Sequence, residues 1–183
     1  MLENLEPKSV FSFFEEIDQI PRGSGNTQKI SDYLAEFAKK RNLFYIQDTL
    51  GNVIIKKDGT AGMEEKEPVI IQGHMDMVAV KELDCEKDME TEGLDLAVQG
   101  DYVYAKGTSL GADDGIAVAY ALALLDSKDI PHPPLEVIIT VDEETGLTGA
   151  FALKSGFMTG DILINLDSED EGELFIGLCL IHI

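Results

Sequence analysis

The sequence predicts an α/β domain built on a mixed, mostly parallel sheet with flanking helices. Mostly apolar runs of strand length occur at residues 69–73, 135–141 and 162–166, and such runs are typical of strands that are covered on both faces. Segments with helical spacing separate these runs, and an alternation of strands with helices favours a parallel sheet. Ligands bind beyond the carboxyl ends of the strands in sheets of this kind.

Two amphipathic helices are expected first. Residues 9–20 show helical spacing and are closed by Pro21, and the loop 22–26 is rich in glycine. Thr27 is placed to cap the second helix. The apolar stripes of the two helices consist of Val10, Phe13, Phe14 and Ile17, and of Ile30, Tyr33, Leu34 and Phe37.

The remaining elements follow from turn residues and apolar spacing. Residues 44–49 and 52–56 are expected to pair as strands, residues 58–67 to form a loop, and residues 69–73 to form a buried strand. The acidic stretch 81–95 is expected to be an irregular surface segment. The later elements are a hairpin at 98–105, a buried helix at 115–125, a buried strand at 135–141, a helix at 148–154 and a buried strand at 162–166.

Composition narrows the class of protein. The chain has 183 residues, of which 44% are hydrophobic and 27% charged, and this is typical of a soluble globular protein with one sizeable core. Fourteen basic residues against 35 acidic ones give a net charge of -21. Such a surface repels nucleic acid and anionic membranes, so neither is expected as a partner.

The expected compartment is the cytoplasm. Cys85 and Cys179 form no disulfide framework and no CxxC pair. The first residues are acidic, where a signal peptide is basic. The longest apolar stretch, around 116–125, is shorter than the roughly 18 residues that a membrane-spanning helix needs.

The most informative short motif is His74-Met75-Asp76, which directly follows an apolar run. Alternate residues of an extended segment point to the same side, so the imidazole and the carboxylate emerge together. A metal-binding histidine and the carboxylate that orients its far nitrogen are commonly arranged in this way. Taken alone, the motif is equally compatible with a structural histidine held by a neighbouring aspartate.

Three further acidic groups favour the metal site: 113–114, 142–144 and Asp167. The alternative for Asp113 or Asp114 is a helix N-cap. For Glu143 and Glu144 the alternative is a solvated loop or a charge in a first helical turn. Asp167 lies so close to an expected buried strand that its carboxylate needs a partner.

One histidine with several carboxylates suits zinc, with manganese or cobalt as substitutes, and His74 argues against calcium. The positive charge of two divalent cations balances the negative charge of three ligating carboxylates and one hydroxide. Such a pair activates water and polarises a carbonyl group, and one carboxylate must stay off the metal to accept the proton of the water. The residues alone do not decide between Glu143 and Glu144, or between Asp113 and Asp114.

Six stretches, taken in order, resemble the M20 metallopeptidases, and specifically their Xaa-His dipeptidase branch (aminoacyl-histidine dipeptidase, peptidase D, carnosinase-like). They are 20–26 (IPRGSGN), 72–78 (QGHMDMV), 108–116 (TSLGADDGI), 132–136 (HPPLE), 140–150 (TVDEETGLTGA) and 165–169 (NLDSE). The resemblance extends to about Gly177 and implies a zinc-peptidase catalytic domain with a phosphorylase/hydrolase-like fold. It also implies that His74 and Asp167 bind one zinc, that Glu144 binds the other, and that Asp113 bridges the two.

The same resemblance implies that Asp76 orients the histidine and that Glu143 is the general base for the bridging water. The implied substrate is a small unblocked dipeptide with a C-terminal histidine, such as carnosine. A related deacylase or tripeptidase is the enzymatic alternative. The alternative from another class is a non-catalytic acidic module for metal binding or assembly.

Family members are longer than this chain, and they add a lid or dimerisation domain and a final histidine ligand. We therefore expect residues 1–177 to be the N-terminal part of the catalytic domain and 178–183 to be an atypical tail. The lid is expected to be absent, and the second zinc to lack its final histidine. The expected consequences are weak metal binding, little hydrolysis, and a homodimer or other self-association through exposed apolar surface.

Overall fold

The computed structural model describes residues 2–168, 172 and 175–176. The expected tail at 178–183 lies outside these residues. The helices are α1 (Lys8–Ile17), α2 (Gln28–Lys40), α3 (Ala112–Asp126) and α4 (Thr148–Phe151). The strands are β1 (Phe44–Gln47), β2 (Val53–Lys57), β3 (Val69–His74), β4 (Leu96–Gln99), β5 (Tyr102–Ala105), β6 (Leu135–Thr140) and β7 (Ile162–Asn165).

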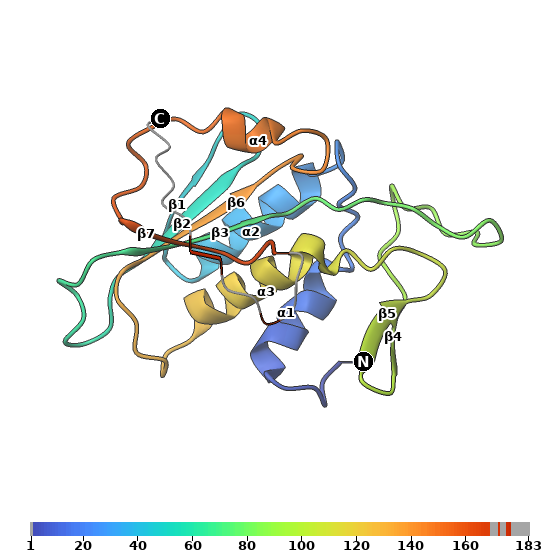
Figure 1. Cartoon of the computed structure of the whole chain (residues 1–183), viewed down its shortest axis with the longest axis horizontal. Coiled ribbons are helices and arrows are strands. Elements are labelled where there is room, and N and C mark those ends of the chain that lie inside the picture. The colour runs from blue at the N-terminus through green and yellow to red at the C-terminus, as the bar shows by residue number, and fades with distance from the viewer. Residues whose placement is uncertain (1, 169–171, 173–174, 177–183) are drawn as a thin grey trace.

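The main sheet has the strand order β1-β2-β6-β3-β7 (Figure 1). β3 pairs in parallel with both β6 and β7, whereas β2 is antiparallel to β1 and to β6. All strands of this sheet except β2 therefore run in one direction, which confirms the mixed, mostly parallel sheet. β4 and β5 form a separate hairpin, as expected.

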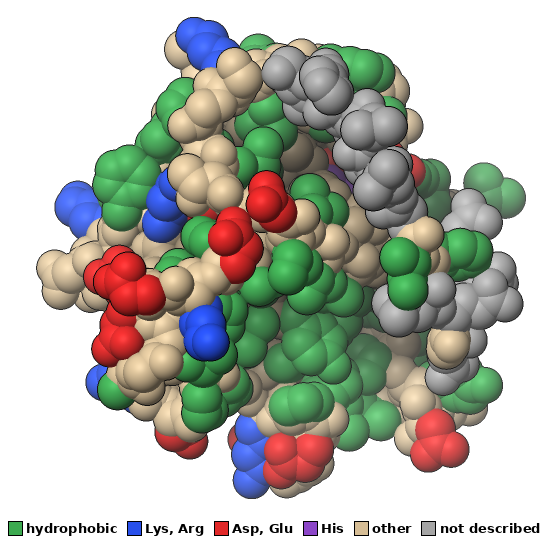
Figure 2. Space-filling model, turned by 60° about the vertical axis from the view of Figure 1, so that its left-hand side comes forward, with side chains coloured by type: hydrophobic (Ala, Val, Ile, Leu, Met, Phe, Trp, Pro, Cys, Tyr) green, Lys and Arg blue, Asp and Glu red, His purple; other side chains and the backbone are tan. Residues whose placement is uncertain are grey.

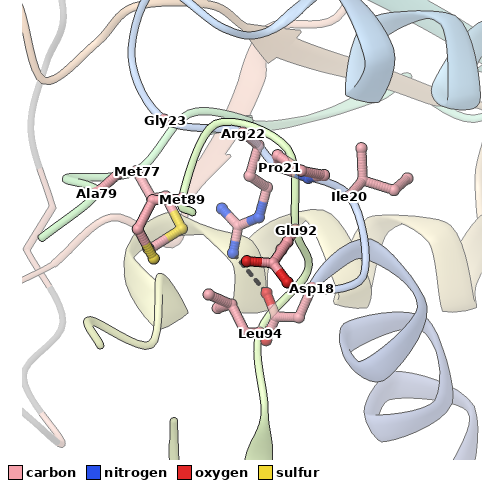
Figure 3. Close-up of a pocket in the computed structure, with 10 residues that line it drawn as sticks. All are labelled: Asp18, Ile20, Pro21, Arg22, Gly23, Met77, Ala79, Met89, Glu92 and Leu94. Carbon is pink, nitrogen blue, oxygen red and sulfur yellow. Dashed lines mark hydrogen bonds and ion pairs between the residues drawn. The ribbon is translucent and has the colours of Figure 1, made fainter. Parts of the chain in front are cut away.

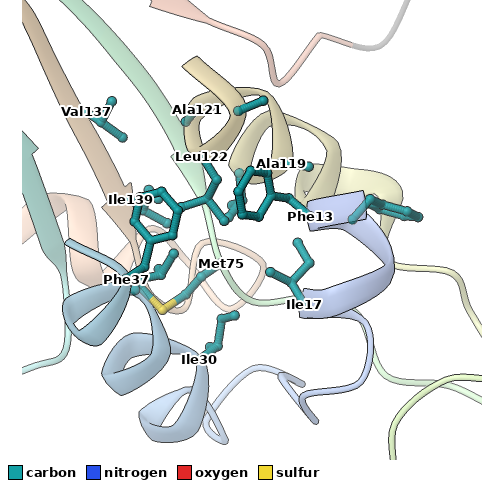
Figure 4. Close-up of a cluster of buried hydrophobic side chains, with 14 of the residues drawn as sticks. Phe13, Ile17, Ile30, Phe37, Met75, Ala119, Ala121, Leu122, Val137 and Ile139 are labelled. Carbon is teal, nitrogen blue, oxygen red and sulfur yellow. The ribbon is translucent and has the colours of Figure 1, made fainter. Parts of the chain in front are cut away.

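The core lies mainly between one face of the sheet and α1, α2 and α3. Figure 4 shows side chains from these helices meeting Met75 and the β6 residues Val137 and Ile139. Phe13 of α1 contacts Phe37 of α2 edge to face, with ring centroids 5.6 Å apart. A smaller cluster on the opposite face contains Ile54, Ile70 and Ile138, with Leu153, Phe157 and Met158 packed against it. Side chains therefore pack on both faces of β3 and β6, as their apolar sequences indicate.

Two expected helices are shorter than predicted. α1 ends at Ile17, because the next turn tightens through bonds from Gln19 N–H to the Glu16 carbonyl and from Ile20 N–H to the Ile17 carbonyl. α4 ends at Phe151 for the same reason, since Leu153 N–H bonds to the Ala150 carbonyl. Thr27 does precede α2, but its side chain makes no capping hydrogen bond.

The expectation that the strand at 162–166 is buried was wrong. Every residue of β7 is exposed, and Ile162, Leu163 and Ile164 are 52%, 54% and 46% exposed. Within the described residues β7 pairs only with β3, so its outer edge is open. Figure 2 shows hydrophobic side chains gathered on one face of the molecule. No helix in the described part of the chain is long and apolar enough to cross a membrane.

Candidate metal centre

His74 is the last residue of β3, and its imidazole is buried. Its Nδ1 lies 3.3 Å from Oδ1 of Asp76, and its Nε2 lies 3.1 Å from Oδ1 of Asp113. The alternation of side chains beyond the strand thus brings the buried Asp76 back to the same imidazole. Both ring nitrogens of His74 are held by carboxylates.

Asp76 also joins two other segments of the chain, the loop with Ser24 and the turn with Glu143 and Glu144. Its Oδ2 accepts a hydrogen bond from the Ser24 hydroxyl at 2.8 Å. The backbone N–H groups of Glu143 and Glu144 donate to its two oxygens at 3.0 and 3.4 Å. Burial opposes ionisation, but the bonds from His74, Ser24 and the Glu143 N–H together hold the pKa of Asp76 below its usual value.

The structure separates the two aspartates of the motif at 108–116. Asp114 is buried and accepts the backbone N–H of His74 at 3.1 Å, and burial raises its pKa to about 7. The carboxylate of Asp113 is exposed and faces the imidazole. A Cβ at Gly73 would lie 2.5 Å from Oδ2 of Asp114, so only glycine fits before the histidine. Asp114 therefore fixes the backbone, and Asp113 presents its oxygens to the site.

The pKa of His74 is also strongly raised. Burial disfavours its charged form, but hydrogen bonds with Asp76 and Asp113 and the negative charge of Asp114 raise its pKa to about 9. Without a metal ion a proton on each ring nitrogen offsets the surrounding negative charge. A divalent cation at Nε2 would take over this role.

Glu143 and Glu144 lie in the turn between β6 and α4, and Asp167 follows β7. Oε2 of Glu143 lies 3.9 Å from His74 Nε2. Two groups of ligand atoms result, each with all of its atoms within 4.8 Å of one another. One group consists of His74, Asp113 and Glu144, and the other consists of His74, Glu143 and Asp167.

The donor atoms of these groups fit divalent cations. A neutral imidazole and several carboxylates suit zinc, manganese or cobalt. The carboxylates crowd one another: burial and then the charge of Asp113 are the main causes that raise the pKa of Glu144. A cation placed among these oxygens would offset that repulsion.

Other polar residues play different parts. Asp142 belongs to neither ligand group and accepts the backbone N–H of Gly25 at 2.7 Å. His132 belongs to neither group, and its Nδ1 contacts the carbonyl of Pro133. Sequence reasoning missed Ser24 as a partner of Asp76, although the glycines around it indicate a loop that approaches other backbone closely.

The profile of peptidase family M20/M25/M40 matches residues 70–178, which is more than half of the chain. This match starts within β3 and includes every residue of the two ligand groups. Membership of this family implies divalent metal ions.

Two dipeptidases are similar to nearly the whole chain. The cytosol non-specific dipeptidase of Escherichia coli strain K12 is 41% identical over 176 residues, which are 96% of this chain and 36% of that protein. The crystal structure of aminoacylhistidine dipeptidase from Vibrio alginolyticus has a TM-score of 0.91 and 44% identity, over 94% of this chain and 35% of that one.

A tripeptidase from Staphylococcus aureus is less similar, with a TM-score of 0.73 and 26% identity, over 89% of this chain and 44% of that one. The present chain thus spans only about a third of the length of the two dipeptidases.

Proposed function

This chain belongs to peptidase family M20/M25/M40, and on that basis we propose that it is the metal-binding catalytic part of a zinc dipeptidase that hydrolyses Xaa-His dipeptides. The observation that carries the proposal is the convergence of the four proposed ligands and of Glu143 near the carboxyl ends of the strands, where their oxygens gather around His74. The similarity to two dipeptidases supports dipeptide substrates over the tripeptidase alternative, because the identity to the tripeptidase is much lower. The name of the Vibrio alginolyticus relative supports the C-terminal histidine. The name of the Escherichia coli relative supports a cytosolic setting.

The proposed centre holds two zinc ions, with manganese or cobalt as substitutes. His74 and Asp167 would bind one ion, Glu144 would bind the other, and Asp113 would bridge them. Asp113 suits the bridging position because its carboxylate lies beside the imidazole and within 4.8 Å of a Glu144 oxygen. When bound, the ions would polarise the peptide carbonyl and make a water molecule more acidic.

The protein side chains would then position and move protons. Asp76 accepts Nδ1–H of His74, so it fixes the ring and leaves Nε2 for the metal. Glu143 would accept the proton of the attacking water and deliver it to the leaving amine. Its backbone N–H is bonded to Asp76, so the histidine and the base are oriented by one carboxylate.

A cavity of about 950 Å³ beside Glu144 offers space for a small peptide. Its walls come from the loop at 23–26, the segment at 77–79 and the stretch at 88–91. We assign the dipeptide to this cavity, next to the ligand groups.

We further propose that residues 1–177 act as one part of a zinc-peptidase catalytic domain, because the chain spans only about a third of the length of the two dipeptidases. This part alone would bind metal weakly and turn over little substrate. The exposed apolar side chains of β7 would favour self-association, including a homodimer.

Hydrolysis assays on the zinc-loaded chain test the proposal. We expect slow release of histidine from carnosine and other Xaa-His dipeptides, and slower cleavage of N-acyl amino acids and tripeptides. Glu143→Gln should lower kcat by at least about 100-fold without releasing zinc, because it removes only the base. Glu64→Gln, in the exposed loop at 58–67, is the matched control and should leave kcat unchanged.

Preferred cleavage of N-acyl amino acids would contradict the dipeptidase assignment. Zinc loss in Glu143→Gln would place Glu143 among the ligands. A zinc-loaded chain with no hydrolysis of any of these substrates would favour the non-catalytic metal-binding module.

A further inference from the structure

Arg22 lies in the glycine-rich loop after α1, and its side chain is almost completely buried, at 1% exposure. One nitrogen, Nη1, donates to the Met75 carbonyl at 3.3 Å. The other, Nη2, donates to the Gly111 carbonyl at 2.6 Å and to Oδ1 of Asp18 at 2.8 Å. Figure 3 shows the guanidinium directed at Asp18, with Met77 close by.

The two carbonyl groups belong to the two segments that carry the proposed ligands. Met75 lies between His74 and Asp76, and Gly111 precedes Asp113 by two residues. One planar side chain thus links the backbone at the end of β3 to the backbone at the start of α3. Arginine suits this role because its donors are fixed in one plane, whereas a lysine ammonium is a single point on a flexible chain.

The glycines around the aspartate pair are explained by the same side chain. A Cβ at Gly111 would lie 2.6 Å from Nη2 of Arg22, and a Cβ at Gly115 would lie 2.5 Å from it. Both distances are too short for a non-bonded contact of a Cβ atom, so any larger residue at either position would displace the guanidinium. The glycines of the motif at 108–116 therefore leave room for Arg22.

Burial of this charge is offset by Asp18, since an isolated buried charge is very costly. Arg22 Nε and Asp18 Oδ2 have no hydrogen-bond partner within the described residues. Both residues line a cavity of about 10 Å³, which is roughly enough space for one water molecule.

We propose that Arg22 is a positioning residue of the metal centre, which holds the segment with His74 and Asp76 in register with the segment that carries Asp113. Within the described residues its hydrogen bonds reach none of the four proposed metal ligands, so it would act through the two carbonyl groups. The proposal rests on the metal centre proposed above.

Cobalt binding to the full metal-free chain tests this role, with the visible absorption of bound Co²⁺ as a readout of coordination geometry. Arg22→Lys should weaken Co²⁺ affinity by about 10- to 100-fold, as is usual for residues that orient ligands, and should change the shape of the spectrum. The matched control is Arg41→Met, which removes an arginine that pairs with Asp126 at 2.6 Å and stacks on Phe37. Its affinity and spectrum should equal those of the parent.

A double variant, Asp18→Leu with Arg22→Met, separates positioning from folding. It removes both charges together, and such replacements are often neutral or stabilising. We expect a cooperative thermal unfolding transition, which shows that the double variant is folded. Its Co²⁺ affinity should be weakened and its Co²⁺ spectrum altered as in Arg22→Lys.

Parent-like affinity and spectrum in the folded double variant would overturn the positioning role while the metal centre stands. Failure of the double variant to fold would assign Arg22 to the fold as a whole and also overturn it. Absence of Co²⁺ binding by the parent would overturn the metal centre itself, and the role of Arg22 with it.

Discussion

β3 and β7 are neighbouring parallel strands of similar apolar sequence, and each leads to a residue of the proposed metal centre. Their environments differ sharply. Ile70 and Ile71 of β3 are 5% and 6% exposed, whereas the isoleucines of β7 are about half exposed. An apolar strand sequence therefore specifies strand formation in both cases, but burial depends on which elements cover the strand.

The same contrast applies to the side chains that the two strands position. His74 is held through both ring nitrogens and through its backbone N–H. Asp167 follows an exposed edge strand, and its backbone N–H bonds locally to the Asn165 side chain. Preorganised ligands bind metal more tightly, so the β3 side of the centre should dominate metal affinity.

The largest expected effect comes from one cross-strand pair, Ile71 and Ile164. Ile71→Ala should lower the free energy of unfolding by about 2–5 kcal/mol, because it leaves a cavity in the core. Ile164→Ala should cost about 1 kcal/mol or less, since that side chain is half exposed. Urea unfolding followed by circular dichroism measures both. Equal losses would mean that β7 is as well covered as β3.

A second prediction concerns pH in the metal-free chain. The pKa of His74 is raised from 6.5 to about 9 on folding. Its protonation therefore contributes stability that is complete below pH 6.5 and is lost as the pH rises through about 9. At 1.36 kcal/mol per unit, the contribution is at most about 3 kcal/mol. The pKa of Asp114 is raised to about 7, so its ionisation changes the free energy of unfolding mainly below pH 7.

Urea unfolding between pH 7 and 9, with chelator present, should show this fall in the parent and lose it in His74→Gln. The control is His132→Gln, at the opposite end of the strands, which should keep the fall. An unchanged pH slope in His74→Gln would show that the buried end of β3 is not the titrating region.

The smallest expected effect on stability is at the open edge. Ile162→Lys should change the free energy of unfolding by about 0.5 kcal/mol or less, because the side chain is already exposed. The same change should reduce association at high protein concentration, since charges on edge strands oppose strand pairing between molecules. Sedimentation velocity measures the association. Unchanged association would show that β7 is not the contact surface.

Most of the fold follows from local patterns. The mostly apolar runs indicated β3 and β6, and the helical stripe of α1 matches its buried residues Val10, Phe13, Phe14 and Ile17. The exposure of β7 was not predictable in this way, because it depends on the absence of a neighbour among the described residues. Helix ends were also missed, since tight turns at Gln19 and Leu153 depend on local hydrogen bonds.

The candidate site was predictable only in part. The alternation of side chains along an extended segment predicted that His74 and Asp76 lie on the same side. The roles of Asp113 and Asp114 depend on the backbone N–H that reaches Asp114, and residue spacing does not show this contact. Arg22 was overlooked because a charged residue in a glycine-rich loop is ordinarily exposed.

Calorimetric titration of the metal-free chain with Zn²⁺ tests the central claim most directly. The account predicts zinc binding by the parent, an affinity at least about 100-fold weaker in His74→Ala, and a smaller loss, about tenfold, in Asp167→Ala. A folded chain that binds no zinc, or a His74→Ala chain that binds zinc as tightly as the parent, would contradict it.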